Sequence, residues 1–232
     1  MTRMLLLVTD TSGRQGSVAL ARPRPLDRDR SDPEVIEVAP LAGGAFSAQL
    51  VPQIAALLAK HGFTKADLEA FIVVSGPGSF TGLRVGLAAI KALAEILKKP
   101  IVPVSLLEVV ALASRSQGKV AAVLDAGRGD VYFGSYKVAR EVHVLQEQLL
   151  STAEFLSAAS ESTLVTPDLT LAAIAREANL SVVVVEPPSA TMIARLGWRK
   201  LQAGETVSSE QLEANYMRRS DAEMFVKPAS SS

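Results

Sequence analysis

The sequence predicts an α/β protein of two lobes, in which each lobe is a mixed β-sheet with helices packed on it. One observation is the order of expected elements: three strands, then alternating helices and strands, occur twice along the chain. The other is composition. With 232 residues, of which 48% are apolar and 21% charged, the chain has enough apolar material for a core in each half.

The first half opens with three expected strands, which are short apolar runs at residues 4–8, 17–20 and 35–38. A helix over residues 48–60 follows, because Leu50, Ile54 and Leu57 recur with helical spacing. Gly62 supplies its C-terminal stop. These elements account for the chain as far as Gly62.

The remainder of the first half alternates strands and helices. Residues 71–74 predict a buried strand, residues 83–97 a helix, and residues 101–104 another strand. Ser105 with Glu108 three residues later has the pattern of a capping box, which predicts the start of a further helix.

The second half repeats this order. Its expected strands lie at residues 120–124, 131–138, 142–145, 163–165 and 182–185. Its expected helices begin near residues 152, 169 and 190, the first with a capping box of Ser151 and Glu154.

The duplicated order is the plan of the actin, Hsp70 and sugar-kinase folds, the ASKHA class. The three leading strands of each half can pair as a meander, whereas strand–helix–strand crossovers force parallel neighbours. We therefore expect an N-terminal lobe at residues 1–107 and a smaller C-terminal lobe at residues 108–212. A tail over residues 213–232 is expected to pack on the first lobe.

Composition limits the classes of function. The absence of cysteine excludes disulfides, thiolate metal sites and a cysteine nucleophile. No run approaches the ~18 apolar residues of a membrane span, so we expect a soluble, cytoplasmic protein without membrane contact. The balance of 24 basic and 24 acidic side chains does not favour tRNA binding by this chain alone.

Two basic clusters interrupt this balance. Residues 22–33 mix arginines with prolines and aspartates, which indicates a solvated, extended hairpin connection. Arg218 and Arg219 fit a solvated chain end or a docking role equally well.

A glycine-rich loop at residues 75–84 precedes the helix at 83–97, a place where backbone amides can hold an anion. Neither common nucleotide motif fits it. A Walker A motif fails because Thr81 or Leu83 stands where its second glycine belongs, and the dinucleotide motif fails because Gly82 comes one residue late.

The following helix carries a stripe of small residues. Gly82, Gly86 and Ala89 lie on one face that continues to Leu93. A helical glycine costs roughly 1 kcal/mol relative to alanine, so close approach of another backbone is expected there. That backbone belongs either to a second subunit or to this chain's own lobe.

Four segments resemble the TsaB (YeaZ) family. The most specific is SGPGSFTGLRVGLAAIKALAEILKKPIVPVSLLEVVA, which is similar to the family's signature loop and helix. LLLVTDTSGRQGSVAL, LDAGRGDVYFGSY and LEANYMRRSDAE resemble its first hairpin, second-lobe opening and tail. The likeness extends from start to end and is weaker at residues 140–205.

The resemblance implies a non-catalytic subunit of the machinery that attaches threonylcarbamoyl to tRNA adenosine (t6A). It implies pairing with a catalytic TsaD-like subunit, addition of a TsaE-like ATPase, a homodimer when alone, and tRNA contact only through the complex. The helices at residues 48–60 and 82–97 would form the pairing surface. The interface residues expected on them are Gly82, Val85, Gly86, Ala89, Leu93, Leu50, Ile54 and Leu57.

The residues agree with a chain that has no catalytic or metal site. Its two histidines, His61 and His143, lie far apart in sequence, and no serine-hydrolase motif occurs. No cofactor is expected beyond weak ATP or ADP with magnesium in the complex. The candidate remnants of a nucleotide site are Asp10, Thr11, Ser12, Asp125, Gly127 and Gly129.

Two alternatives stay open. One is an ATP-dependent phosphotransferase of the sugar-kinase type, for which the sequence offers no identifiable catalytic aspartate. The other is a metallopeptidase of the type once ascribed to TsaD relatives, for which ligand spacing is missing.

Overall fold

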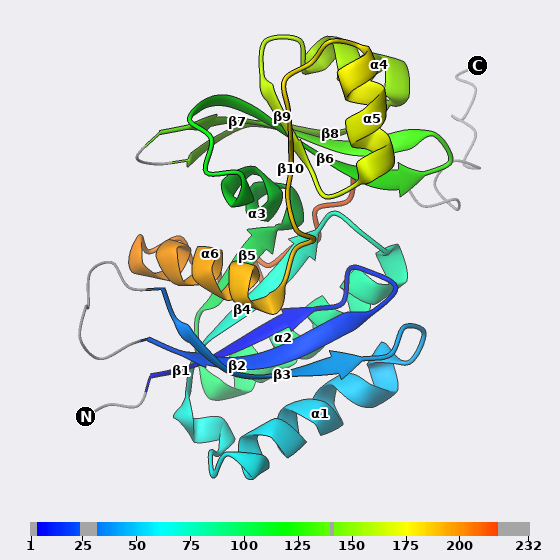
Figure 1. The fold of residues 1–232 in the computed structure, drawn as a ribbon. Coiled ribbons are helices and arrows are strands. Elements are labelled where there is room, and N and C mark those ends of the chain that lie inside the picture. The colour runs from blue at the N-terminus through cyan, green and yellow to red at the C-terminus, as the bar shows by residue number, and fades with distance from the viewer. Residues whose placement is uncertain (1–3, 24–31, 140–141, 218–232) are drawn as a thin grey trace, which may run out of the picture.

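The computed structural model describes residues 4–23, 32–139 and 142–217. It contains two five-stranded sheets, one above the other in Figure 1. The strand order is β3-β2-β1-β4-β5 in the first sheet and β8-β7-β6-β9-β10 in the second. The two halves therefore share one topology, as the duplicated order of elements predicted.

The first sheet combines a meander with parallel crossovers. Its strands are β1 (Leu5–Asp10), β2 (Gly16–Arg22), β3 (Glu34–Leu41), β4 (Leu68–Gly76) and β5 (Ile101–Ser105). The β1–β2 and β2–β3 pairs are antiparallel, whereas β1–β4 and β4–β5 are parallel. This is the pairing that two short connections followed by two helical crossovers require.

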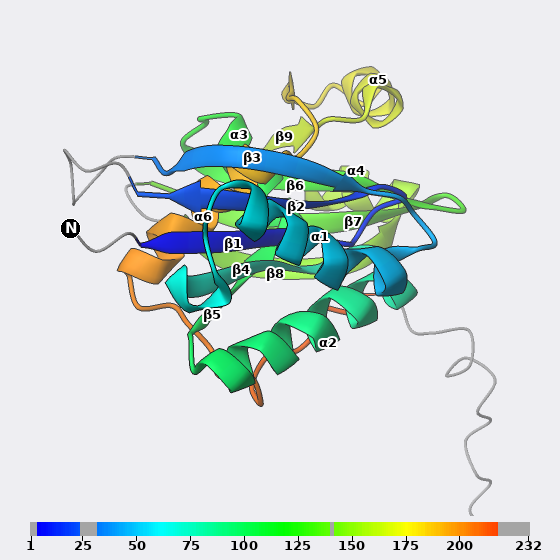
Figure 2. The same cartoon turned by 90° about the horizontal axis from the view of Figure 1, so that it is seen from below.

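Helices cover both faces of the first sheet. Helices α1 (Phe46–Lys60) and α2 (Phe80–Leu97) lie side by side on one face, as Figure 2 shows from below, and the short η1 (Lys65–Asp67) follows α1. Helix α6 (Ala190–Gln202) packs on the opposite face against β1, β3, β4 and β5. The first core is therefore enclosed on both sides of the sheet.

The position of α6 corrects the expected domain boundary. Although α6 follows the second sheet in sequence, Ile193, Ala194 and Trp198 belong to the core of the first. Gly197 allows this packing, since a Cβ there would lie 2.4 Å from Ile72. Helical periodicity identifies an apolar face but not the sheet that it covers, so sequence reasoning assigned α6 to the wrong lobe.

The second sheet has its own core on each face. Its strands are β6 (Gly118–Gly127), β7 (Asp130–Val138), β8 (Val142–Ser151), β9 (Thr163–Thr166) and β10 (Val182–Val184). Alternate residues of β6 divide between the faces. Ala121 and Val123 meet α4 (Thr152–Ala158) and α5 (Leu169–Glu177), whereas Val120 and Ala122 meet α3 (Leu106–Ala113).

Helix α3 connects the lobes. Leu107 and Val110 pack in the second core, and Val109 packs in the first. After α6 the chain returns to the first lobe, where Val207 bridges to Ile101 beside β5. Of the expected tail, residues 213–217 lie against the end of β4, and residues 218–232, with Arg218 and Arg219, fall outside the described residues. Residues 24–31 of the arginine-rich connection also fall outside them.

Candidate functional site

The β1–β2 turn holds Asp10 by its own chain. The backbone N–H and the hydroxyl of Ser12 both donate to Asp10 Oδ1, at 2.9 and 2.6 Å. Burial raises the pKa of Asp10, and the two hydrogen bonds from Ser12 oppose that rise. One oxygen of this carboxyl therefore already accepts hydrogen bonds within its own turn.

The glycine-rich loop after β4 packs on the same turn. Ser79 caps α2 by accepting from the Gly82 N–H at 3.3 Å, and its own N–H donates to the Ser12 carbonyl at 2.7 Å. A Cβ on Gly78 would lie 2.4 Å from that carbonyl oxygen. Because Gly78 has no side chain, the loop backbone can approach the backbone of Ser12 closely within the lobe.

Thr11 explains both glycines of α2. A Cβ on Gly82 would lie 2.1 Å from the Thr11 carbonyl oxygen, and one on Gly86 would lie 2.1 Å from Thr11 Oγ1. Both glycines are buried. Packing within the chain therefore accounts for these two glycines without a second subunit.

The other expected interface residues lie in or against the core of the first lobe. Leu50, Ile54 and Leu57 are buried in the first core, where they pack against this chain's own sheet. Their helical spacing identified an apolar side of α1, and in the structure that side faces the sheet. The remaining expected residues, Val85, Ala89 and Leu93, are partly buried against the same core.

The outward sides of α1 and α2 carry apolar residues that the sequence reasoning missed. Val51 is 52% exposed and Ile96 is 71% exposed. We call the exposed apolar residues of these helices the α1–α2 face. Its members are Ala48, Val51, Pro52, Ala55, Ala56 and Ala59 on α1, and Ala88, Ala92 and Ile96 on α2.

The β6–β7 turn is the counterpart of the β1–β2 turn in the second lobe. Its Asp125 is exposed and accepts from the Gly127 N–H at 2.9 Å. Gly127, Arg128 and Gly129 have φ of 72°, 62° and 82°, so the glycines meet a backbone requirement of the turn. A nucleotide site formed by the two turns stays a prediction.

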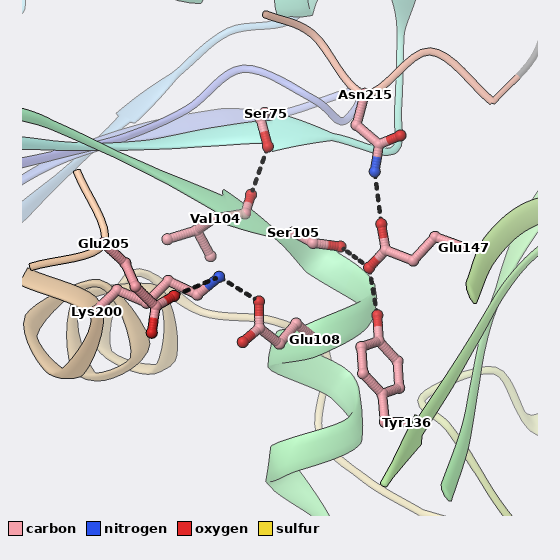
Figure 3. A network of polar contacts seen from close by, with 9 residues as sticks. All are labelled: Ser75, Val104, Ser105, Glu108, Tyr136, Glu147, Lys200, Glu205 and Asn215. Carbon is pink, nitrogen blue, oxygen red and sulfur yellow. Dashed lines mark hydrogen bonds and ion pairs between the residues drawn. The ribbon is translucent and has the colours of Figure 1, made fainter. Parts of the chain in front are cut away.

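A polar network that the sequence did not reveal joins the lobes (Figure 3). We call Ser105, Tyr136, Glu147 and Asn215 the interlobe network. Ser105 Oγ donates to Glu147 Oε1 at 2.6 Å, and the Tyr136 hydroxyl donates to the same oxygen. Asn215 Nδ2 donates to Glu147 Oε2 at 2.5 Å.

Tyr136 reaches Glu147 across Gly134. Glu147 on β8 lies opposite Gly134 on β7, and a Cβ on Gly134 would lie 2.7 Å from the Tyr136 ring. Burial and the neighbouring Glu147 carboxylate raise the pKa of Tyr136 far above its usual range, so the phenol stays protonated and donates. A glycine two residues before a tyrosine in a strand is the sequence signal that could have indicated this arrangement.

The expected capping box at α3 is wrong. Ser105 makes no side-chain cap hydrogen bond, because its hydroxyl donates to Glu147. Glu108 instead pairs with Lys200 of α6 at 2.7 Å and is 5% exposed. Burial raises the pKa of Glu108, and Lys200 opposes the rise. Both residues of the pattern thus serve contacts between lobes.

Neither histidine belongs to a cluster of potential metal ligands. His61 caps the C-terminus of α1, and its Nε2 lies 2.7 Å from Glu37 Oε2. His143 is exposed on β8. Throughout the described ranges, no three His, Asp or Glu side chains gather in a way that could hold a metal ion.

Two sheets of identical strand order, with corresponding turns after β1 and β6, define a protein of the actin, Hsp70 and sugar-kinase fold class. The model of the family TsaD, tRNA N6-adenosine threonylcarbamoyltransferase, matches residues 38–223. The chain is 32% identical over 161 residues to the tRNA threonylcarbamoyladenosine biosynthesis protein TsaB of Bacillus subtilis, covering 68% of this chain and 67% of that protein.

A second relative spans nearly the whole chain. The TsaB protein of Haemophilus influenzae is 28% identical over 235 residues, covering 94% of this chain and 95% of the relative. The solved structure of YeaZ from Pseudomonas aeruginosa shares the fold, with a TM-score of 0.65, 24% identity, and coverage of 92% and 99% of the two chains. The chain belongs to the TsaB (YeaZ) family.

Within the described parts of the chain, no helix combines the length and apolar character that crossing a bilayer requires.

Proposed function

We propose that this chain is a non-catalytic subunit that pairs with a TsaD-type transferase and activates it for threonylcarbamoyl addition to tRNA adenosine. Its relatives in Bacillus subtilis and Haemophilus influenzae carry names that place them in threonylcarbamoyladenosine biosynthesis. The observation that carries the pairing is the α1–α2 face.

This face has the composition of a contact surface. A solvent-facing helix side normally carries charged residues, yet the outward side of α1 around Val51 and Ala55 is made of alanine, valine and proline. Contiguous exposed apolar surface marks interaction sites. Its alanines also leave room for a partner helix to approach closely.

A supporting rather than catalytic role agrees with how the polar candidates are used. Asp10 is held by Ser12, and His61 is paired with Glu37. Glu147 accepts three hydrogen bonds from its own chain. In the proposal these groups maintain the fold, and the TsaD-type partner supplies the reacting groups.

The same proposal assigns the other components. Alone, the chain pairs with a second copy through the α1–α2 face, and the TsaD-type subunit replaces that copy. A TsaE-type ATPase and tRNA join through the resulting pair in the cytoplasm. ATP or ADP with magnesium binds weakly, and only in the complex.

The test is co-purification with a tagged TsaD-type subunit. Val51→Glu and Ile96→Glu place a carboxylate on the α1–α2 face, so we expect both variants to lose capture. Leu169→Glu is the matched control, because Leu169 of α5 is 71% exposed, as Ile96 is, and lies in the other lobe. Equal capture of all three folded variants would show that pairing uses another surface.

A further inference from the structure

The two lobes are tied together on both sides of α3 (Figure 3). On one side, Glu108 of α3 pairs with Lys200 of α6, and Lys200 also lies 3.8 Å from Glu205. The Glu108–Lys200 pair is largely buried, so loss of either partner would leave an uncompensated charge. The continuous chain from β5 into α3 runs between this pair and Glu147, so α3 has the position of a hinge.

The other side is closed by residues 213–217, which we call the strap. Asn215 touches both lobes at once: its backbone N–H donates to the Ser75 carbonyl at 2.8 Å, and its side chain donates to Glu147 Oε2 at 2.5 Å. Ser75 belongs to the first sheet and Glu147 to the second. One residue therefore bridges the lobes without belonging to either sheet.

The strap fits closely on the first lobe. A Cβ on Gly76 would lie 2.7 Å from the Asn215 carbonyl oxygen, and Gly76 has φ of 143°, so glycine is needed there on both counts. Tyr216 adds a second anchor. Its ring centroid lies 4.8 Å from that of Phe80, and its hydroxyl accepts from Arg84 Nε at 3.2 Å.

The strap contacts the second lobe through Asn215 and Met217. On the Glu147 carboxylate, Oε1 accepts from Ser105 and Tyr136, whereas Oε2 accepts from Asn215. Met217 of the strap adds an apolar contact with the second core. Ser105 of the first sheet and Asn215 of the strap therefore hold the same second-lobe carboxylate, one on each oxygen.

We propose that the strap is a latch, in which the Asn215–Glu147 hydrogen bond, beside the Met217 contact, keeps Glu147 seated on Ser105 and so holds the lobes at one angle about α3. When the Asn215–Glu147 bond is lost, the second lobe samples other angles about α3. This inference goes beyond subunit pairing, because it concerns the conformation of one chain and holds in the absence of any partner.

The latch can be tested with spin labels, because the chain contains no cysteine of its own. Ala66→Cys in η1 and Ala173→Cys in α5 place one label at an exposed site in each lobe. Pulsed EPR then reports the distribution of interlobe distances, with labelled protein diluted into unlabelled protein to suppress signals between copies.

Asn215→Asp is the first test variant. At about pH 8, well above ordinary carboxyl pKa values, it places a carboxylate against Glu147 in place of an amide donor. We expect a broader distance distribution with a longer mean. Asn179→Asp is the matched control, since Asn179 is exposed in a turn after α5, and it should leave the distribution unchanged.

Glu147→Gln in the Asn215→Asp background exchanges the partners of this bond. The glutamine oxygen still accepts from Ser105 and Tyr136, and its amide now donates to Asp at position 215, so the narrow distribution should return. An unchanged distribution in Asn215→Asp would overturn the proposal, as would a broadening that Glu147→Gln fails to reverse. If Asn215→Asp fails to fold, Asn215→Ala replaces it as the test variant. An unchanged distance distribution in Asn215→Ala would likewise overturn the proposal.

Discussion

Thr11 lies directly against the bare Cα of Gly86: a Cβ built there would be 2.1 Å from Thr11 Oγ1. Thr11 is 2% exposed, so it has little room to move away. The first hairpin turn is therefore seated on α2, and through α2 on the glycine-rich loop that begins this helix. The most characteristic motifs of the first lobe form one packed unit.

Gly86→Ala should destabilise the protein. Overpacking at a buried contact costs roughly 1–3 kcal/mol, which exceeds the ~1 kcal/mol that alanine gains in helix propensity. Urea unfolding of the two proteins measures the difference. In a Thr11→Ala background the clashing hydroxyl is gone, so the same substitution should cost less. A more stable Gly86→Ala protein in the Thr11 background would contradict this account of the small stripe.

Asp10→Asn should raise the melting temperature near neutral pH. Because burial raises the pKa of Asp10 above its ordinary value of 3.8, the folded state favours the protonated acid. The stability that this preference provides is fully present below pH 3.8 and is lost as pH rises through the folded-state pKa.

An asparagine side chain stays neutral throughout, so the advantage of the variant should shrink as pH falls toward the unfolded-state value. Thermal unfolding of both proteins across acidic to neutral buffers measures this. A difference that grows on acidification would mean that the hydrogen bonds from Ser12 outweigh burial.

Tyr136→Phe should destabilise the second lobe beside its contact with the first. It removes one hydroxyl that donates to the Glu147 carboxylate while keeping the buried ring over Gly134. Hydrogen bonds to charged groups contribute about 1.5–3 kcal/mol, so a loss of stability of that order is expected in urea unfolding. Tyr216→Phe is the control, because that hydroxyl is at the surface and its loss should change stability by less than about 0.5 kcal/mol. Equal losses in the two variants would argue against a special role for Glu147.

Sequence reasoning succeeded where local pattern and tertiary structure agree. The order of elements gave both sheets, and the capping box of Ser151 and Glu154 is present, with both of its hydrogen bonds. The same pattern at Ser105 and Glu108 correctly marked the start of α3, but the hydrogen bonds of the capping box are not formed, because Glu147 and Lys200 compete for these side chains from distant parts of the chain. Local spacing contains no information about such partners.

Three residues expected on the pairing surface lie in the core for a related reason. Helical period correctly grouped Leu50, Ile54 and Leu57, but a buried core face and a partner-binding face have the same period. On α1 the outward side is apolar as well, so the pattern could not distinguish the two. Only the position of the sheet identifies Val51 and Ala55 as the accessible side.

Titration with magnesium and ATP separates the proposed role from that of a phosphotransferase. A site with a dissociation constant tenfold below the ligand concentration would add about 1.4 kcal/mol of stability, which raises the melting temperature of a protein of this size by roughly 3–6 °C. For the isolated chain we expect a shift of less than about 1 °C at millimolar nucleotide. The physical reason is that Asp10 is engaged by Ser12, and Asp125 by the Gly127 N–H of its own turn. A shift of several degrees that Asp10→Ala and Asp125→Ala each abolish would establish a working nucleotide site between the two turns, and with it the phosphotransferase alternative.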